Sequence, residues 1–538
     1  MGVHHGRMSE DRGSAKDGDG IRDGVAPPEG TGSGAGGHRH RPTSEAFRRF
    51  VAAGWAPRPE ELPHLAESAA WAAPRREWLS AAFPGTRLVL PAGVLRVRSN
   101  DTDYRFRSHA AFTHLTGIGA AAEPDSVLVL EPVSGADGQD GPGHEAVLFF
   151  RPPSARDSRE FYADARYGEL WVGPRPRLDE VEALTGLRCR HLDELHDALA
   201  KDVGEGGVPV RLVRRADPAV DAVVAEARAA GGTDAERAAA DDAELARAVS
   251  ELRLVKDTWE VAELRRAVEI TAEAFADIVR ALPAALASPR GERVVEGVFA
   301  LRAREEGNGV GYDTIAAAGP HACTLHWIHN DGTVHPGDLL LVDAGVEVDS
   351  LYTADVTRTL PVSGTFNSAQ RAVYEVVLEA ADAAFAVASP GVRFRDVHAA
   401  AMRVIATRLH AWGWLPGSVE ESLADEGQFH RRWMVHGTSH HLGLDVHDCP
   451  PARSEMYLDA ELRPGMVFTI EPGLYLMPDD LLVPEEMRGI GVRIEDDVLV
   501  TVDGVENLSA MLPRTPDGVE AWMAGLARDT STGQHRHA

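Results

Sequence analysis

Residues 339–346, Leu-Leu-Leu-Val-Asp-Ala-Gly-Val, set a carboxylate directly behind four apolar residues. Such a short apolar run is typical of a buried strand, and Asp343 at its end needs a partner because an isolated buried charge is costly. Other carboxylates also occupy predicted strands: Glu471 ends the apolar strand of MVFTIEPG (466–473), Asp355 alternates with β-formers in TADVTRTL (353–360), and Glu495 lies inside the strand of GVRIEDDVLV (491–500). Four carboxylates at strand positions in one domain would repel one another strongly unless cations neutralise them.

A histidine-rich run, His-Gly-Thr-Ser-His-His-Leu-Gly-Leu-Asp-Val-His-Asp, occupies residues 436–448. Any one histidine is more often a hydrogen-bonded core residue, but His436, His440 and His447 beside four carboxylates favour a metal site. Two divalent cations balance the four negative charges, and a neutral imidazole adds a fifth ligand. Oxygen ligands with one nitrogen suit manganese, cobalt, iron or catalytic zinc, and not a structural thiolate site. Two such ions can activate water and polarise a carbonyl.

These motifs resemble those of aminopeptidase P, the Xaa-Pro aminopeptidase of the pita-bread metallopeptidases. The resemblance spans about residues 70–512, and LVDAG, ADVTRT, the 436–448 run, EPGLY and VRIEDD follow in family order. It implies an α/β N-terminal domain and an α+β pita-bread catalytic domain. It also implies that a metal-bridging hydroxide hydrolyses the peptide bond before a proline in second position. Two divalent ions would be bound, with manganese the preferred metal and cobalt, zinc or iron the alternatives.

The resemblance assigns roles residue by residue. Asp343 would bind one metal ion, Asp355 and Glu495 would bridge both, and His440 and Glu471 would bind the other. Glu471 would also carry the proton of the nucleophile. His326 and His447 would contact the substrate carbonyl and the tetrahedral intermediate. His436, Arg493 and Tyr475 would shape the proline side of the pocket. Asp101 would lie on the N-terminal segment that reaches toward the active site, and Trp171 would contact a neighbouring subunit of an oligomer.

Three positions depart from the family pattern. The spacing from Asp343 to Asp355 is twelve residues, one more than expected, and the turn near residues 348–351 should absorb it. His441 replaces a common bulky aromatic residue and would either tune the pocket or simply pack. Trp327 replaces a frequent tyrosine after His326.

Composition divides the chain and excludes some functions. Residues 1–43 and 514–538 are expected to be tails, 69–245 an α/β domain and 246–513 the metallopeptidase domain; residues 228–256 look like a linker entering a helix. Asp257 and Glu260 form a predicted capping box. The 55 basic and 83 acidic residues give a net charge of −28, which argues against nucleic-acid and polybasic membrane binding. With no spanning or signal segment and three scattered cysteines, a cytoplasmic protein is expected.

Other functions stay open at this point. Prolidase, which cleaves only dipeptides, shares the signature; the TLHW and ELWVG segments favour aminopeptidase P. Methionine aminopeptidase usually lacks a large preceding domain, and a creatinase-like enzyme would not need the five ligands. A non-enzymatic pita-bread binding protein would typically have lost them. A homodimer or homotetramer is implied by the resemblance alone.

Overall fold

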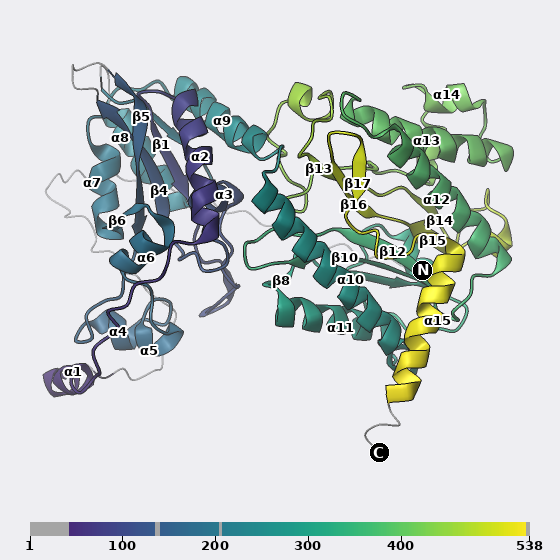
Figure 1. The fold of residues 1–538 in the computed structure, drawn as a ribbon, viewed down its shortest axis with the longest axis horizontal. Coiled ribbons are helices and arrows are strands. Elements are labelled where there is room, and N and C mark those ends of the chain that lie inside the picture. Colours follow the sequence, from purple (N-terminus) through teal and green to yellow (C-terminus); the bar gives the residue numbers. More distant parts are fainter. Residues whose placement is uncertain (1–41, 43, 135–139, 204–206, 534–538) are drawn as a thin grey trace, which may run out of the picture.

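Two domains lie side by side along the long axis of the molecule (Figure 1). The structure is a computed structural model that describes residues 42, 44–134, 140–203 and 207–533. The tail expected over residues 1–43 therefore lies almost wholly outside the described residues. Within those residues, no helix is long and apolar enough to cross a membrane.

The N-terminal domain is built on a five-stranded mixed sheet in the order β6-β5-β4-β1-β7. Both faces of this sheet are buried. Leu88 and Leu90 contribute to the core on one face, and Val89 between them contributes to the core on the other. Two-sided burial explains why these strands read as continuous apolar runs instead of alternating ones. The strands are β1 (Arg87–Pro91), β4 (Val127–Ser134), β5 (Asp140–Phe150), β6 (Arg188–His191) and β7 (Val210–Leu212), with a small hairpin of β2 (Val97–Ser99) and β3 (Thr102–Asp103).

Helices cover this sheet, and the last of them corrects the expected boundary. The predicted limit at 245/246 falls inside α9, which buries Leu245 and Val249 in the N-terminal core. Most of the expected linker is therefore helical, and the first domain runs through α9 and the residue that caps it, Arg253. The helices are α1 (Glu45–Ala52), α2 (Glu67–Ala82), α3 (Ala110–Thr116), α4 (Arg159–Ala163), α5 (Glu169–Val172), α6 (Leu178–Thr185), α7 (Leu195–Ala200), α8 (Pro218–Ala230) and α9 (Ala235–Leu252).

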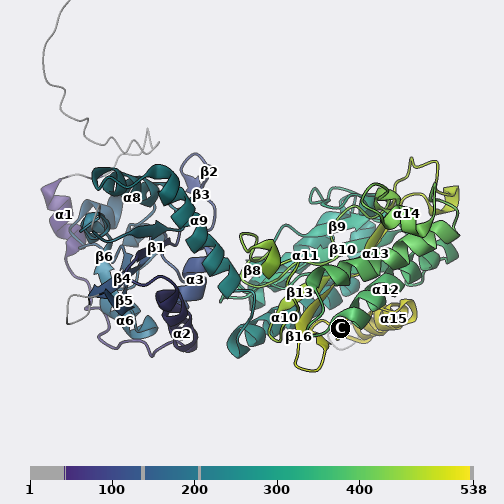
Figure 2. The same ribbon diagram turned by 90° about the horizontal axis from the view of Figure 1, so that it is seen from above.

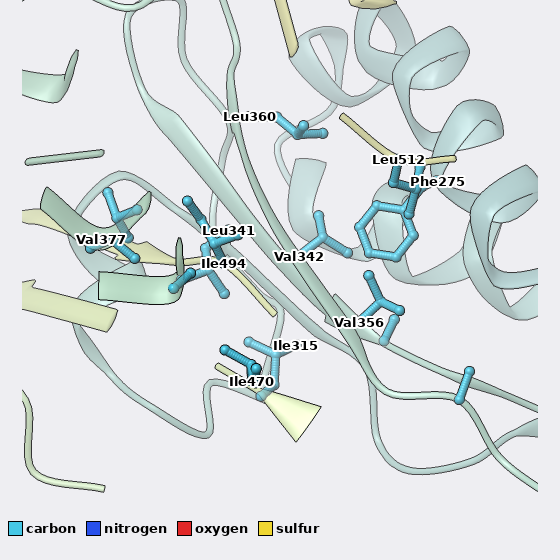
Figure 3. Packing of buried hydrophobic residues seen from close by; sticks show 14 of the residues in the cluster. Phe275, Ile315, Leu341, Val342, Val356, Leu360, Val377, Ile470, Ile494 and Leu512 are labelled. Carbon is cyan, nitrogen blue, oxygen red and sulfur yellow. The ribbon is translucent and has the colours of Figure 1, made fainter. Parts of the chain in front are cut away.

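The C-terminal domain packs two helix pairs against short antiparallel sheets. Helix α10 (Thr258–Ala287) pairs with α11 (Gly291–Glu306), and α12 (Ser368–Val387) pairs with α13 (Phe394–Ala411). The predicted capping box forms, since Asp257 accepts from the Glu260 amide and Glu260 accepts from the Asp257 amide. Phe275 of α10 and Val377 of α12 meet strand residues such as Leu341 in one continuous core (Figure 3).

The strands of this domain fall into small sheets whose ends converge. One sheet has the order β12-β10-β9, another β13-β16-β17, and β14-β15 and β11-β8 are two-stranded antiparallel pairs. Their bounds are β8 (Gly309–Val310), β9 (Ile315–Ala318), β10 (Leu339–Ala344), β11 (Val346–Glu347), β12 (Val356–Pro361), β13 (Val467–Ile470), β14 (Gly473–Leu476), β15 (Ile490–Arg493), β16 (Asp496–Val500) and β17 (Val505–Asn507). Short helical segments of this domain are α14 (Val419–Leu423) and the 3-10 turns Gly319–Cys323, Phe429–Arg432, Ser454–Met456 and Glu485–Met487, while the 3-10 turn Leu192–Glu194 belongs to the N-terminal domain.

The C-terminal segment corrects the prediction of a tail after residue 513. Residues Pro516–Gly533 form helix α15, which lies against α10 and α12 at the edge of the domain (Figures 1 and 2). Val519 and Met523 enter the main core, with 0% and 4% of their surface exposed. Trp522 and Leu526 pack against the same core, so one apolar side of the helix docks it, although the surrounding polar residues resemble a tail.

We expect Met523→Ala to destabilise the C-terminal domain by about 2–3 kcal/mol, because a buried methionine is replaced by a cavity. Met511→Ala is the matched control, since Met511 is 51% exposed and should cost less than about 0.5 kcal/mol. Thermal and urea unfolding of both variants measure the difference. Equal midpoints for the two variants would contradict the docking of α15.

Candidate metal centre

The four predicted carboxylates lie where the short sheets converge. Asp343 is near the end of β10, Asp355 immediately precedes β12, Glu471 follows β13, and Glu495 separates β15 from β16. Asp343, Asp355 and Glu495 are almost completely buried, and Glu471 is half-buried. The strand ends thus bring together acidic groups that are up to 152 residues apart in the chain (343 to 495).

His440 reaches the same point because its segment runs beside β13. The Thr469 amide donates to the His440 carbonyl over 2.9 Å, and the Glu471 amide donates to the Thr438 carbonyl over 2.9 Å. His440 Nε2 then lies 3.3 Å from Asp355 Oδ2 and 3.5 Å from Glu471 Oε1. Ligand atoms of Asp355, His440 and Glu495 all lie within 4.8 Å of one another, which is the spacing of a shared cation.

Mutual repulsion marks this group. Burial, followed by the charges of Asp355, Glu471 and Asp343, raises the pKa of Glu495 well above its usual value. Burial also raises the pKa of Glu471 to about 8 and raises that of Asp343. A carboxylate cluster that resists ionisation in the bare protein is one that divalent cations would stabilise, so the residues fit a metal centre.

His440 shows the opposite effect of its neighbours. Burial alone would lower the pKa of His440, but its hydrogen bond to Asp355 and the charge of Glu471 outweigh burial and raise it to about 9. In the bare protein a proton therefore occupies the place that a cation would take. The imidazole must lose this proton to become a ligand.

Tyr312 joins two of the carboxylates and was missed by sequence reasoning. Its hydroxyl lies 2.7 Å from Asp343 Oδ1 and 2.5 Å from Asp355 Oδ1. Thr357 donates to Glu495 over 2.7 Å, and the buried Asp497 accepts from the Asp355 amide over 3.1 Å. Nothing in a single sequence distinguishes the tyrosine of Gly-Val-Gly-Tyr-Asp from an ordinary loop residue, because its partners lie 31 and 43 residues away.

The residues predicted for the proline side form a chain of contacts. His436 Nε2 lies 2.8 Å from the Tyr475 hydroxyl, which also accepts from Arg493 Nη1 over 2.9 Å. The other terminal nitrogen of Arg493, Nη2, donates a hydrogen bond to Asp343 Oδ2. His436 Nδ1 lies 3.5 Å from Glu471 Oε2, so this chain contacts the carboxylate cluster at both ends.

The two remaining histidines are exposed, one beside the cluster and one on a supported loop. The ring of His447 packs edge-on against that of His440, with centroids 4.4 Å apart. His326 lies on a loop fastened by the fully buried Glu292. The carboxylate of Glu292 accepts hydrogen bonds from Ala318 N, His321 Nδ1, Trp327 Nε1 and Gly332 N at 2.7–2.9 Å.

Each departure has a structural account. The twelve-residue spacing from Asp343 to Asp355 includes the turn after β11, where Leu351 adopts the left-handed region at φ 71°. Asp355 still reaches the cluster. His441 is fully buried and stacks on Phe394 with centroids 4.7 Å apart. Neither of its ring nitrogens has a hydrogen-bond partner among the described residues, so it packs as an aromatic ring. The Trp327 indole gains a bond to Glu292 that anchors its loop.

Asp101 is exposed in the turn between β2 and β3 of the N-terminal domain. Arg105 and Arg107, farther along the same segment, donate hydrogen bonds to the C-terminal domain. The segment therefore does meet the catalytic domain, through its arginines. A substrate role for Asp101 itself stays a prediction.

Comparison with known proteins agrees with this geometry. Residues 262–502 match the model of metallopeptidase family M24, and residues 72–208 match the aminopeptidase P N-terminal domain. Xaa-Pro aminopeptidase 2 of Streptomyces coelicolor is 53% identical over 484 residues, covering 90% of this chain and 97% of the relative. Xaa-Pro aminopeptidase 1 of the same organism is 50% identical, covering 90% and 93%.

The chain belongs to the aminopeptidase P family. Its fold is that of aminopeptidase P from Escherichia coli with the inhibitor Pro-Leu, with a TM-score of 0.72 and 32% identity over 86% of this chain and all of that one. The fold class is therefore confirmed: an aminopeptidase P N-terminal domain precedes a pita-bread metallopeptidase domain. Membership in a metallopeptidase family also implies that the present protein binds divalent metal ions.

We expect Tyr312→Phe to weaken metal binding by about 10- to 100-fold, because two proposed ligand carboxylates lose the hydroxyl that orients them. Tyr374→Phe is the matched control, since this buried hydroxyl bonds to the Arg514 carbonyl, away from the cluster. Metal titration by calorimetry compares the two variants. Equal affinities would show that Tyr312 orients nothing.

Metal affinity should rise with pH between about 6.5 and 9. The raised pKa values of His440, about 9, and Glu471, about 8, mean that this interacting pair holds protons at neutral pH that a cation must displace. Raising the pH removes these protons and so favours binding. Manganese titrations in two buffers of different ionisation enthalpy would count the protons released, and a pH-independent affinity would contradict the assignment.

Proposed function

We propose that this protein is an Xaa-Pro aminopeptidase, which removes an N-terminal residue from peptides with proline in second position. The observation that carries the proposal is the cluster that four carboxylates at strand ends form with His440. The hydrogen-bonded residues Arg493, Tyr475 and His436 flank this cluster. Family membership supports the reaction class, and the aminopeptidase P N-terminal domain favours this activity over prolidase.

The proposed site holds two divalent ions, with manganese first and cobalt, zinc or iron as alternatives. Asp343 would hold one ion, His440 and Glu471 the other, and Asp355 and Glu495 both. Bound ions of this kind supply a nucleophilic water and polarise the scissile carbonyl. That polarisation matters because an Xaa-Pro bond is a tertiary amide with a ring on its nitrogen and no N–H.

The chain's own residues would perform the remaining steps. Glu471, adjacent to both His440 and His436, accepts the proton of the attacking water at its carboxylate and returns it to the proline nitrogen. His447 and His326 donate hydrogen bonds to the carbonyl oxygen as it gains charge. The chain His436–Tyr475–Arg493 borders the proline ring and fixes the direction from which it enters.

The proposed enzyme is a homodimer or homotetramer in the cytoplasm. Support for assembly comes from α5, where Leu170, Trp171 and Val172 are consecutive apolar residues with 52%, 43% and 52% of their surface exposed. A patch of this kind is typical of an interface. Light scattering distinguishes monomer, dimer and tetramer. The cytoplasmic location, and the absence of nucleic-acid and membrane partners, stay predictions from the sequence.

The purified protein should hydrolyse an Xaa-Pro-Yaa tripeptide faster than the Xaa-Pro dipeptide, and should not cleave the Xaa-Ala-Yaa analogue at a comparable rate. Chelation should abolish the activity, and manganese should restore it. Liquid chromatography of the products measures all three rates. Cleavage of the dipeptide alone would favour prolidase, and no hydrolysis with metal bound would favour a binding protein.

Two variants separate the roles within the site. Glu495→Ala should lose metal and activity together, because a shared ligand is removed. His447→Ala should lose at least about 100-fold in turnover while its metal content, measured by mass spectrometry, stays unchanged. Metal loss in His447→Ala, or full activity in Glu495→Ala, would contradict the assignment.

A further inference from the structure

We propose that the N-terminal domain positions His447 through two arginine–aspartate pairs, Arg107–Asp445 and Arg253–Asp448, that bracket the turn on which His447 lies. The inference rests on the proposed function, because His447 is the substrate histidine of that reaction. It makes Arg107 and Arg253 positioning residues, although neither belongs to the domain that holds the metal centre.

His447 depends on its turn for its position. Its side chain is exposed beside the cluster, and among the described residues no hydrogen bond holds its imidazole. A histidine that must meet a carbonyl oxygen at hydrogen-bonding distance therefore takes its position from the backbone of residues 443–448. Displacement by about 1 Å is enough to cost about a hundredfold in rate.

Arg107 holds one side of this turn. It lies on the loop between β3 and α3, and its guanidinium donates to the Leu444 carbonyl and, over 3.2 Å, to Asp445 Oδ1. Its Nε donates over 2.6 Å to Glu347, a buried carboxylate on β11. Three acceptors around one planar fork suit arginine and cannot be matched by lysine.

Arg253 holds the other side. It caps the end of α9, whose residues Leu245 and Val249 belong to the N-terminal core. Its Nε donates over 3.1 Å to Asp448 Oδ1, and both side chains are buried. The turn is packed tightly here, since a Cβ added to Gly443 would lie 2.3 Å from Asp448 Oδ2.

The two pairs enclose His447 in sequence. Asp445 and Asp448 stand two residues before it and one residue after it, and each is held by an arginine from the N-terminal side of the molecule. The turn is thus fixed at both ends by the neighbouring domain. A role limited to holding the domains together would not require both contacts to fall on this one turn.

Arg107→Gln tests the proposal, because Arg107 is partly exposed and the Glu347 carboxylate that it contacts keeps a 2.7 Å hydrogen bond from Asn308. We expect kcat on an Xaa-Pro-Yaa peptide to fall about 10- to 100-fold, with metal content unchanged. Arg107→Lys should recover only part of the loss, because an ammonium group cannot reach all three acceptors.

Arg105→Gln is the matched control. Arg105 lies on the same loop and donates across the interface to the Asn308 carbonyl, away from the histidine turn. This variant should keep kcat within about twofold of the wild type. Thermal unfolding of both variants shows whether either substitution disturbs the fold.

A double-mutant cycle measures the coupling between Arg107 and His447, and a purely structural role of Arg107 would give no such coupling. In the His447→Ala background, adding Arg107→Gln should change the single-turnover rate at high enzyme concentration by less than about twofold, because the group that Arg107 positions is already absent. An additive loss, equal effects of Arg105→Gln and Arg107→Gln, or metal loss in Arg107→Gln would each overturn the proposal. Failure of the proposed function is separate, since it would appear as absence of turnover in the wild type.

Discussion

Repulsion among four carboxylates, three of them buried and one half-buried, is the constraint on which the C-terminal domain depends. Asp343, Asp355, Glu471 and Glu495 are held together by short strands that end at one point, and the pKa values of three of them are raised there. The core of two helix pairs supplies the stability that such a cluster lacks. The arginine, tyrosine and threonine side chains around it then fix the direction of its oxygens, leaving the cations to supply the missing charge.

Much of this site could be predicted from sequence, because a carboxylate at the end of an apolar strand is a local signal. The long helices were equally accessible through their apolar spacing and the Asp257–Glu260 capping box. Tyr312, Glu292 and Arg107 could not be found in this way. Each acts through partners that only the folded chain brings near, and each sits in a local sequence that suits any loop or helix. Helix α15 was missed for another reason: a few apolar residues on one side dock it, while the rest of its composition resembles a tail.

The two domains also depend on each other beyond simple contact. Arg75 of α2 donates to Asp257 at the start of α10 over 2.6 Å, and His114 lies 3.3 Å from Glu260. These contacts set the interface from which Arg107 and Arg253 reach the histidine turn. A metal centre complete in its ligands would still lack a fixed substrate histidine if the N-terminal domain were displaced. This dependence gives a physical reason for a peptidase to retain a domain that supplies no proposed metal ligand.

The position of α15 has a consequence for biosynthesis. Its buried residues, Val519 and Met523, leave the ribosome after every proposed metal ligand, and they complete a core to which α10 and α12 also contribute. The N-terminal domain can fold during translation, as such domains generally do. The part of the C-terminal core that α15 covers is therefore completed last, after every residue of the carboxylate cluster has been synthesised. Until then the surfaces of α10 and α12 that α15 covers are left without this partner.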